Sequence, residues 1–269
     1  MLFAVLGPFD VRSGDRSLAP TATKPRQVLA LLTLRAGQLV TTCTLMEELW
    51  GDTLPRSAST TLQTYVLRLR RLLAEGAEHE RLSAESAPVI RTRPGGYLLE
   101  MPGGRSDAEE FERLSAGGRS AFAAGDYGGA VRLLSAALAL WRGPALTDVP
   151  TGPVLVIEAL RLGEMRLADI ELRITAEFRL GREGTLIGEL AVLTAEHPMH
   201  EGLHHHFMLA LHRSGQSWRA LLVFQRLRVT LLEELGMEPS PRIRELRQAI
   251  LEGDPALQQP GVPSAEGIA

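Results

Sequence analysis

The segment EMPGGRS at residues 100–106 constrains the fold most, because its Pro-Gly-Gly interrupts the periodicity of both strand and helix. Short extended segments are mixed with helical ones before it, whereas Ala and Leu recur at helical spacing after it. We therefore predict two domains, residues 1–104 and 105–252, followed by a flexible tail at 253–269. After about residue 252 we expect no further ATPase or sensor domain.

The two parts differ in charge. Residues 1–104 hold 12 basic and 10 acidic side chains, a net of +2, and residues 105–269 hold 17 basic and 22 acidic ones, a net of -5. The net charge of -3 for the whole chain is therefore an average of two surfaces, of which only the first suits a polyanion such as DNA. Lys24 is the single lysine among 29 basic residues, and no P-loop motif for ATP is present.

Several other classes of protein are excluded or disfavoured. Cys43 is the single cysteine, so neither an intrachain disulfide nor a Cys-based zinc site can form, which favours a reducing, cytoplasmic location. No apolar run approaches the ~18 residues that a membrane span needs, and the N-terminus lacks the basic region of a secretory signal. No Ser-His-Asp or paired-carboxylate motif has a recognisable context. We expect no enzymatic activity, no cofactor, no metal and no membrane partner.

The front part has the element order of a winged helix-turn-helix. Its predicted elements are extended segments at Leu2–Leu6 and Phe9–Val11, helices at about Lys24–Arg35, Thr44–Trp50 and Ser57–Leu73, and a hairpin of Val89–Arg93 and Tyr97–Glu100. The Thr44-to-Glu47 segment has the pattern of a capping box. Two helices, a basic helix and a basic hairpin follow one another in the order that this DNA-binding fold requires.

The third predicted helix carries the strongest functional signal. One face is apolar and predicts core, at Leu62, Val66, Leu69 and Leu73, while residues 53–74 contain four arginines and no acid. Four arginines on a helix can also be plain solvated charge, but the missing acids and the basic hairpin favour DNA. The candidate DNA-binding residues are Thr60, Thr61, Gln63, Thr64, Leu67, Arg68, Arg70 and Arg71 on the helix and Arg91 and Arg93 on the hairpin.

Each of these residue types suits a particular part of DNA. Threonine and leucine can contact thymine methyl groups, Gln63 can pair with adenine, and Arg68 or Arg71 can bind guanine or phosphate. An arginine near a hairpin tip, such as Arg93, is of the kind that enters a narrow minor groove.

Residues 24–97 resemble the DNA-binding domain of the Streptomyces antibiotic regulatory protein family, which is itself similar to OmpR-type response regulators. The most specific marks are Leu-Arg-Arg-Leu at 69–72 and Thr-Arg-Pro-Gly-Gly-Tyr at 92–97. The resemblance implies that the third helix reads the major groove of direct-repeat promoter sites and that Arg93 approaches the minor groove. It also implies a loop that faces RNA polymerase, including its sigma factor, formed by Asp52, Thr53, Leu54, Pro55 and Arg56.

The rear part contains a repeat. Gly125, Gly181 and Gly215 are each followed by Ala, Leu or Phe at positions +5, +9 and +12, and the last two glycines are 34 residues apart, the period of a tetratricopeptide repeat. The first pair is 56 residues apart, so we expect an extra helix around Val154–Leu162. Such an array either binds a peptide or partner domain, or serves only as a rigid body for the front domain.

Three segments of the rear part, at 135–146, 196–224 and 231–251, resemble the bacterial transcriptional activation domain of the same family. The predicted fold class is thus an α+β winged helix-turn-helix followed by an all-α tetratricopeptide-like repeat domain. The resemblance implies a transcription activator of an antibiotic or other secondary-metabolite gene cluster that can self-associate on tandem sites.

Two other functions stay open at this point. One is a helical-repeat adaptor that binds protein and not DNA, which would show no shift with promoter fragments in size exclusion. The other is an enzyme that uses a metal at His200, His204, His205 and His206. Because no third ligand of defined spacing accompanies His200 and His204, a structural role for this cluster is favoured.

Overall fold

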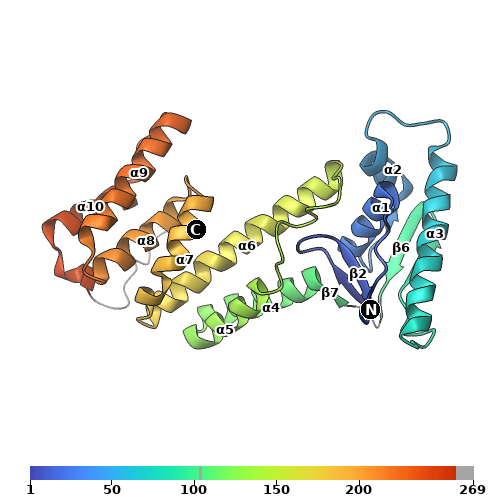
Figure 1. The fold of residues 1–269 in the computed structure, drawn as a ribbon, viewed down its shortest axis with the longest axis horizontal. Coiled ribbons are helices and arrows are strands. Elements are labelled where there is room, and N and C mark those ends of the chain that lie inside the picture. Colours follow the sequence, from blue (N-terminus) through green and yellow to red (C-terminus); the bar gives the residue numbers. More distant parts are fainter. Residues whose placement is uncertain (103–104, 259–269) are drawn as a thin grey trace. The chain divides into compact units, whose positions relative to one another are not determined.

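The computed structural model describes residues 1–102 and 105–258 (Figure 1). Its packing divides the chain into two compact units. The first unit consists of residues 1–116 and 135–167, and the second of residues 117–134 and the chain from residue 168 onward. The first unit therefore combines the whole front part with helical residues of the rear part, a division different from the sequence boundary at residue 104.

A four-stranded sheet in the order β3-β2-β1-β7 begins the first unit. Its strands are β1 (Leu2–Ala4), β2 (Asp10–Ser13), β3 (Arg16–Ser17) and β7 (Arg105–Ser106). β1 pairs antiparallel with β2 and parallel with β7, and its Phe3 lies opposite Val11, both fully buried. The extended segments predicted near the N-terminus are thus confirmed. β7 has only two residues, too few for a periodicity that the sequence could reveal.

Three helices form the centre of the winged helix: α1 (Thr23–Leu34), α2 (Thr42–Trp50) and α3 (Ala58–His79). The predicted capping box placed the start of α2 at Thr44, which is wrong. Thr41 is the N-cap, and its side chain accepts a hydrogen bond from the Thr44 amide at 3.0 Å. The helix begins earlier because Val40 and Thr41 form strand β4 (Val40–Thr41), which delivers the capping threonine directly to its first turn.

α3 is longer than the predicted 57–73, since it continues to His79. Gly76 and Ala77 in its last turns are buried, although the sequence around them is polar. A Cβ added to Gly76 would lie 2.3 Å from Leu18 Cδ1, and the Gly76 carbonyl accepts a hydrogen bond from Ser13 at 3.0 Å. Glu80, just after the helix, binds the N-terminal ammonium group at 2.8 Å and so anchors this end. Tertiary packing thus extends the helix past the end of its apolar periodicity.

The hairpin has the predicted position. β5 (Val89–Arg93) pairs antiparallel with β6 (Gly96–Glu100), and β4 pairs with the other edge of β6. Gly95 in the turn has φ +83°, a conformation that favours glycine. At Gly96 a Cβ would come within 2.1 Å of the Val40 carbonyl oxygen, so the close approach of β4 also requires glycine there.

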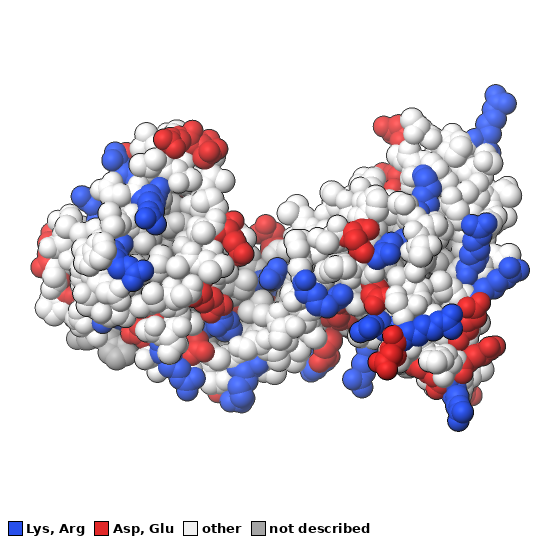
Figure 2. All heavy atoms as spheres, viewed as in Figure 1, with Lys and Arg blue, Asp and Glu red and all other residues white. Residues whose placement is uncertain are grey.

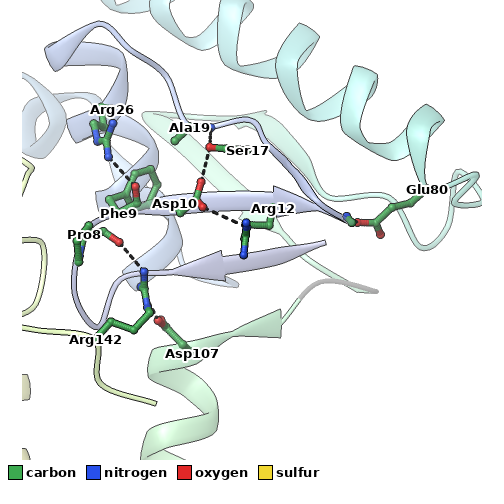
Figure 3. Close-up of polar contacts among 11 residues, drawn as sticks. Pro8, Phe9, Asp10, Arg12, Ser17, Ala19, Arg26, Glu80, Asp107 and Arg142 are labelled. Atoms are coloured by element: carbon green, nitrogen blue, oxygen red, sulfur yellow. Dashed lines mark hydrogen bonds and ion pairs between the residues drawn. The ribbon is translucent and has the colours of Figure 1, made fainter. Parts of the chain in front are cut away.

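The rear part completes the first unit through the beginnings of α4 (Asp107–Ala123) and α6 (Pro153–Arg179) and the loop before α6. Asp107 accepts hydrogen bonds from the amides of Val5 and Leu6 at 2.7 and 3.1 Å. Arg142 donates to the Pro8 carbonyl at 3.0 Å and lies 3.3 Å from the Asp107 carboxylate (Figure 3). These contacts fasten the first sheet to the start of α4.

The second unit contains the ends of α4 and α6, the first part of α5 (Tyr127–Leu138), and the helices α7 (Ile187–Glu196), α8 (Glu201–Arg213), α9 (Ser217–Leu235) and α10 (Pro241–Glu252). The three repeat glycines have φ between +69° and +78° and separate successive helices. The residues at +5, +9 and +12 are all buried, which confirms the repeat. Residues 154–162 are helical, as expected, but they do not form a separate extra helix, because they are the start of α6, which continues unbroken through Gly163.

A short 3-10 helix, η1 (Glu183–Leu186), precedes α7, and a second, η2 (Pro255–Gln258), occupies the start of the predicted tail. The Leu257 carbonyl there accepts a hydrogen bond from Arg213 Nε at 2.8 Å. The remainder of the predicted tail, residues 259–269, lies outside the described residues. No helix in the described ranges has both the length and the apolar character that crossing a bilayer demands.

Candidate nucleic-acid interface

The two faces of α3 have the predicted characters. Leu62, Val66, Leu69 and Leu73 are each 1% exposed and form the core side. The opposite face is exposed and carries Thr60, Gln63, Thr64, Leu67, Arg68 and Arg71, while Thr61 is half-buried at its edge. Thr64 donates its hydroxyl to the Thr60 carbonyl at 3.0 Å, which leaves its acceptor lone pairs and its methyl group for an outside contact. This face offers short polar groups and one exposed leucine, as a helix in a major groove needs.

Of the three arginines of α3, Arg68 and Arg71 have neither an ion pair nor a side-chain hydrogen bond with any described residue, whereas Arg70 makes hydrogen bonds. Both are exposed, and no acid occurs on α3 before Glu75. Figure 2 shows basic side chains along the part of the surface where the first turns of α3 lie, with acidic ones gathered toward its far end. The positive potential of the first unit is therefore concentrated on one helix face.

Arg70 has a different environment. Its Nε donates to the Ile90 carbonyl at 2.7 Å and its Nη2 to the Thr92 hydroxyl at 2.8 Å. The side chain is half-buried and joins α3 to strand β5. Arg70 is thus placed to fix the hairpin relative to the helix, whereas Arg68 and Arg71 point to no partner of their own.

The hairpin arginines share one carboxylate. Arg91 Nε lies 2.6 Å from Glu100 Oε2, and Arg93 Nη2 lies 3.5 Å from Glu100 Oε1. The sequence predicted both arginines as DNA-binding residues but did not reveal Glu100 as their partner. The signal was available, because in the register Val89↔Glu100 and Arg91↔Leu98 the residues 89, 91, 98 and 100 share a face of the hairpin. Both arginine side chains remain about half exposed, at 52% and 51%.

The predicted polymerase-facing loop, Asp52 to Arg56, is exposed along its whole length. Leu54 is 55% exposed, and the Thr53 hydroxyl donates to the Trp50 carbonyl at 3.0 Å. Lys24, which the sequence analysis considered only as a lone lysine, donates from Nζ to the Leu49 carbonyl at 2.6 Å and lies 4.7 Å from the Trp50 ring centroid. The end of α2, and with it the start of the loop, is therefore held by α1.

Glu48 is a residue of α2 that the sequence analysis did not single out. It is 3% exposed, and its carboxylate accepts hydrogen bonds from the amides of Gly152, Val154 and Leu155 at 2.6, 2.9 and 3.0 Å. These amides belong to the N-terminal end of α6, where free N–H groups and the helix dipole favour an anion. The helix next to the exposed loop is thus joined directly to the first turn of α6.

The histidine cluster lies in the second unit, around the start of α8. His200 is the N-cap of α8, and its Nδ1 accepts a hydrogen bond from the Leu203 amide. Burial, and next the charge of Arg242, lowers the pKa of His205 to about 3. Burial lowers the pKa of His206 to about 4, and its Nδ1 lies 2.9 Å from the Gly202 carbonyl. In the described part of the chain no three His, Cys, Asp or Glu side chains are grouped as metal ligands would be.

Two family models match the chain. Residues 17–99 match "Transcriptional regulatory protein, C terminal", and residues 106–251 match "Bacterial transcriptional activator domain". The first match contains α1 to α3 and the hairpin, and the second contains the repeat helices.

Individual proteins match over nearly the whole chain. Regulatory protein DnrI of Streptomyces peucetius is 46% identical over all of this chain and 99% of its own length. Regulatory protein AfsR of Streptomyces coelicolor is 37% identical over 98% of this chain, which spans only 25% of that longer protein. Among solved structures, Mycobacterium tuberculosis EmbR in complex with a low-affinity phosphopeptide matches with a TM-score of 0.81 and 32% identity, covering 95% of this chain and 67% of that one.

Proposed function

The chain belongs to the Streptomyces antibiotic regulatory protein family of DNA-binding transcription activators, and on this premise we propose how it acts. It activates an antibiotic or other secondary-metabolite gene cluster in the bacterial cytoplasm. It binds direct repeats near promoters through the exposed face of α3 and the hairpin, and it recruits RNA polymerase through its sigma factor. The observation that carries the proposal is the exposed face of α3, which has no acid before Glu75, beside a basic hairpin.

In the major groove, Thr60, Thr64 and Leu67 contact thymine methyl groups, and Gln63, with Thr61 at the edge, reaches neighbouring base edges or phosphates. Arg71 extends from the same stripe toward a base or a phosphate. Arg68 lies on the flank that faces the start of α1, where it lines a shallow hollow with Thr21 and Ala22. Ala22 is the N-cap of α1 and supplies no side-chain cap, so free amides beside Arg68 favour a phosphate there.

The hairpin contributes in a second way. Arg93, close to the turn, enters the minor groove, and Arg91 follows the adjacent backbone. Arg70 keeps the hairpin at a fixed distance from α3 through its bonds to Ile90 and Thr92, so that helix and hairpin engage the duplex together.

Polymerase recruitment is assigned to the loop from Asp52 to Arg56. The exposed Leu54 gives this loop an apolar contact point, and Arg56 adds a charge. Since Lys24 holds the preceding helix end and Glu48 joins α2 to α6, the loop is presented on a fixed base. Neighbouring copies on a direct repeat follow one another along the DNA and self-associate there.

Binding-site selection from random DNA with the full chain supplies the fragment for the test, and we expect one short motif repeated in the same direction about one helical turn apart. An inverted repeat or a single motif would contradict the tandem arrangement. On this fragment Arg71→Ala or Arg68→Ala should weaken binding about threefold to tenfold and reduce the slope of log affinity against log salt by about 1, because one phosphate contact is lost. Arg16→Ala, which removes an exposed arginine of β3, is the control. Unchanged affinity of both α3 variants across the salt series would refute the interface.

A further inference from the structure

The outer face of α9 carries an apolar stripe. Trp218, Leu222, Val229 and Leu232 are 66%, 47%, 51% and 44% exposed. The inner face of the same helix is already packed, with buried Ala220, Val223, Phe224, Leu227 and Leu231. Single exposed apolar residues are ordinary on a protein surface, but four on one side of one helix indicate a contact with another molecule.

The spacing of the stripe indicates what kind of contact this is. Its positions alternate in steps of four and three residues along the helix, at Trp218, Leu222, Gln225, Val229, Leu232 and Gly236. This is the a/d spacing of a coiled-coil seam, and it extends from the first turn of α9 to Gly236, the C-cap that follows the helix. A seam of this type packs against another helix with the same periodicity.

We propose that α9 pairs in antiparallel orientation with α9 of a second copy of this chain. In this register Leu222 packs on the partner's Leu232, and Trp218 lies over the partner's Gly236, so that the largest side chain of the seam meets the position without one. A parallel pair would instead place Trp218 against the partner's Trp218 and leave the two glycines facing each other. The size pattern of the seam is therefore complementary to itself only when one helix is reversed.

The flanking charges agree with the reversed orientation. Arg219 lies beside the partner's Glu233, and by symmetry Glu233 lies beside the partner's Arg219, which gives two equal ion pairs. A parallel pair would direct Glu233 toward the partner's Arg228. Within its own chain Arg228 is already bound by both carboxylate oxygens of Glu238, at 2.7 and 2.6 Å, so that contact would have to replace an existing ion pair. Size therefore selects the reversed arrangement, and the pairing of Arg219 with Glu233 is compatible with it.

The seam also sets the strength of the contact. Gln225 near its centre weakens it, and Arg226 meets the partner's Arg226 at the axis, so we expect a dimer that dissociates in the micromolar range. An isologous pair has a two-fold axis, whereas copies on a direct repeat follow one another head to tail. The α9 pair is therefore a contact of the free protein. It goes beyond the proposed function and rests on no property of the DNA interface.

The first test measures mass by sedimentation equilibrium of the full chain without DNA across the micromolar range. We expect a monomer–dimer equilibrium, and we expect Leu222→Arg to weaken it at least about a hundredfold, since a charge would be placed in the seam of both copies. Leu251→Arg, at a leucine of α10 that is 51% exposed, is the matched control and should leave the equilibrium unchanged. A wild-type chain that stays monomeric, or a Leu222→Arg chain that still dimerises, overturns the proposal.

A charge exchange tests the orientation. Arg219→Glu should weaken the dimer about five- to tenfold, because two attractive pairs become repulsive, and adding Glu233→Arg should restore it. Failure of the double variant to recover would overturn the pairing of these two residues.

Cross-linking gives an independent measure of the same register. In a Cys43→Ser background, chains with Leu222→Cys and chains with Leu232→Cys should form a disulfide only when the two are mixed. A disulfide within either single-variant sample indicates a parallel pair and overturns the proposal, as does the absence of any cross-link. None of these measurements includes DNA, so their outcome is separate from that of the promoter-binding test.

Discussion

The two compact units differ in the ionisable groups that they enclose. The first unit buries carboxylates, at Glu48 and Asp107, and surrounds them with backbone amides. Both carboxylates connect segments that are about 100 residues apart in the sequence. A buried charge is costly unless hydrogen bonds satisfy it, and here amides at the start of α6 and in the loop after β1 do so.

The second unit also buries a carboxylate, that of Asp169, which pairs with Arg119 at 2.9 Å, but it encloses imidazole rings as well. His204, His205 and His206 follow one another at the start of α8, and burial lowers the pKa of all three. His206 stacks edge-on against Phe178 with ring centroids 5.1 Å apart. The rings are therefore neutral when folded. Among these groups, the first unit contributes buried carboxylates that accept hydrogen bonds from amides, and the second contributes imidazole rings that are neutral when folded.

The comparison predicts that mild acid destabilises the second unit and not the first. For His205 and His206 the folded pKa lies below the unfolded value, so at pH below about 6.5 the unfolded chain takes up protons that the folded one does not. Each histidine should then lower the free energy of unfolding by about 2 kcal/mol at pH 5, because 1.5 pH units correspond to that amount. Hydrogen exchange at pH 7 and pH 5 should show protection lost first in α8.

In the first unit, the pKa of a buried group is shifted in the opposite direction. Burial raises the pKa of Asp107, against the amides of Val5 and Leu6 and the charge of Arg142. Its folded form binds a proton more tightly than the unfolded form, so acidification does not remove its contribution. His205→Leu with His206→Leu should flatten the pH dependence, and His79→Gln, at an exposed histidine of the first unit, should not. Equal loss of protection in α3 and α8 at pH 5 would contradict the comparison.

Removing a buried carboxylate should have the next largest effect on stability, and this effect should be confined to the first unit. Glu48→Ala leaves three amides at the start of α6 without their acceptor, and we expect it to lower the free energy of unfolding by about 2 to 4 kcal/mol. Glu47→Ala is the matched control, because that neighbouring side chain is exposed and should change stability by less than about 0.5 kcal/mol. Urea unfolding of the two variants measures the difference. Equal stability of both would show that Glu48 does not hold α6.

The faces of α3 and the positions of the hairpin strands could be predicted because both follow from periodicity. Leu62, Val66, Leu69 and Leu73 repeat at helical spacing, and burial of that face leaves Thr64 and Arg71 on the other. The same reasoning found the buried positions of the repeats. Periodicity failed where tertiary contacts determine how far a helix extends. At the end of α3, the packing around buried Gly76 continues the helix although its sequence there is polar.

Contacts between distant segments left no periodic signal. Glu48 and Glu47 are equivalent by residue type, and only the position of α6 makes one a buried cap and the other a solvated charge. Arg70 likewise has the same composition signal as Arg71, yet the hairpin engages Arg70 alone. Side-chain partners of this kind depend on which distant segments of the chain pack together, and neither residue spacing nor composition indicates that.

Glu100 is a partly exposed carboxylate of the same unit as Glu48, and of the changes considered its substitution should have the smallest effect, which is on DNA affinity. This carboxylate pairs with both hairpin arginines, which must leave it to reach phosphates. Glu100→Gln should therefore tighten binding to the selected DNA about two- to fivefold at low salt, since each exposed pair is worth at most about 1 kcal/mol. The gain should shrink at high salt, where the wild-type pairs are screened. Asp15→Asn removes an equal charge from the turn between β2 and β3 and corrects for the general loss of repulsion. If both variants bind DNA equally tightly, Glu100 does not restrain the two arginines, and its carboxylate has no specific effect on DNA binding.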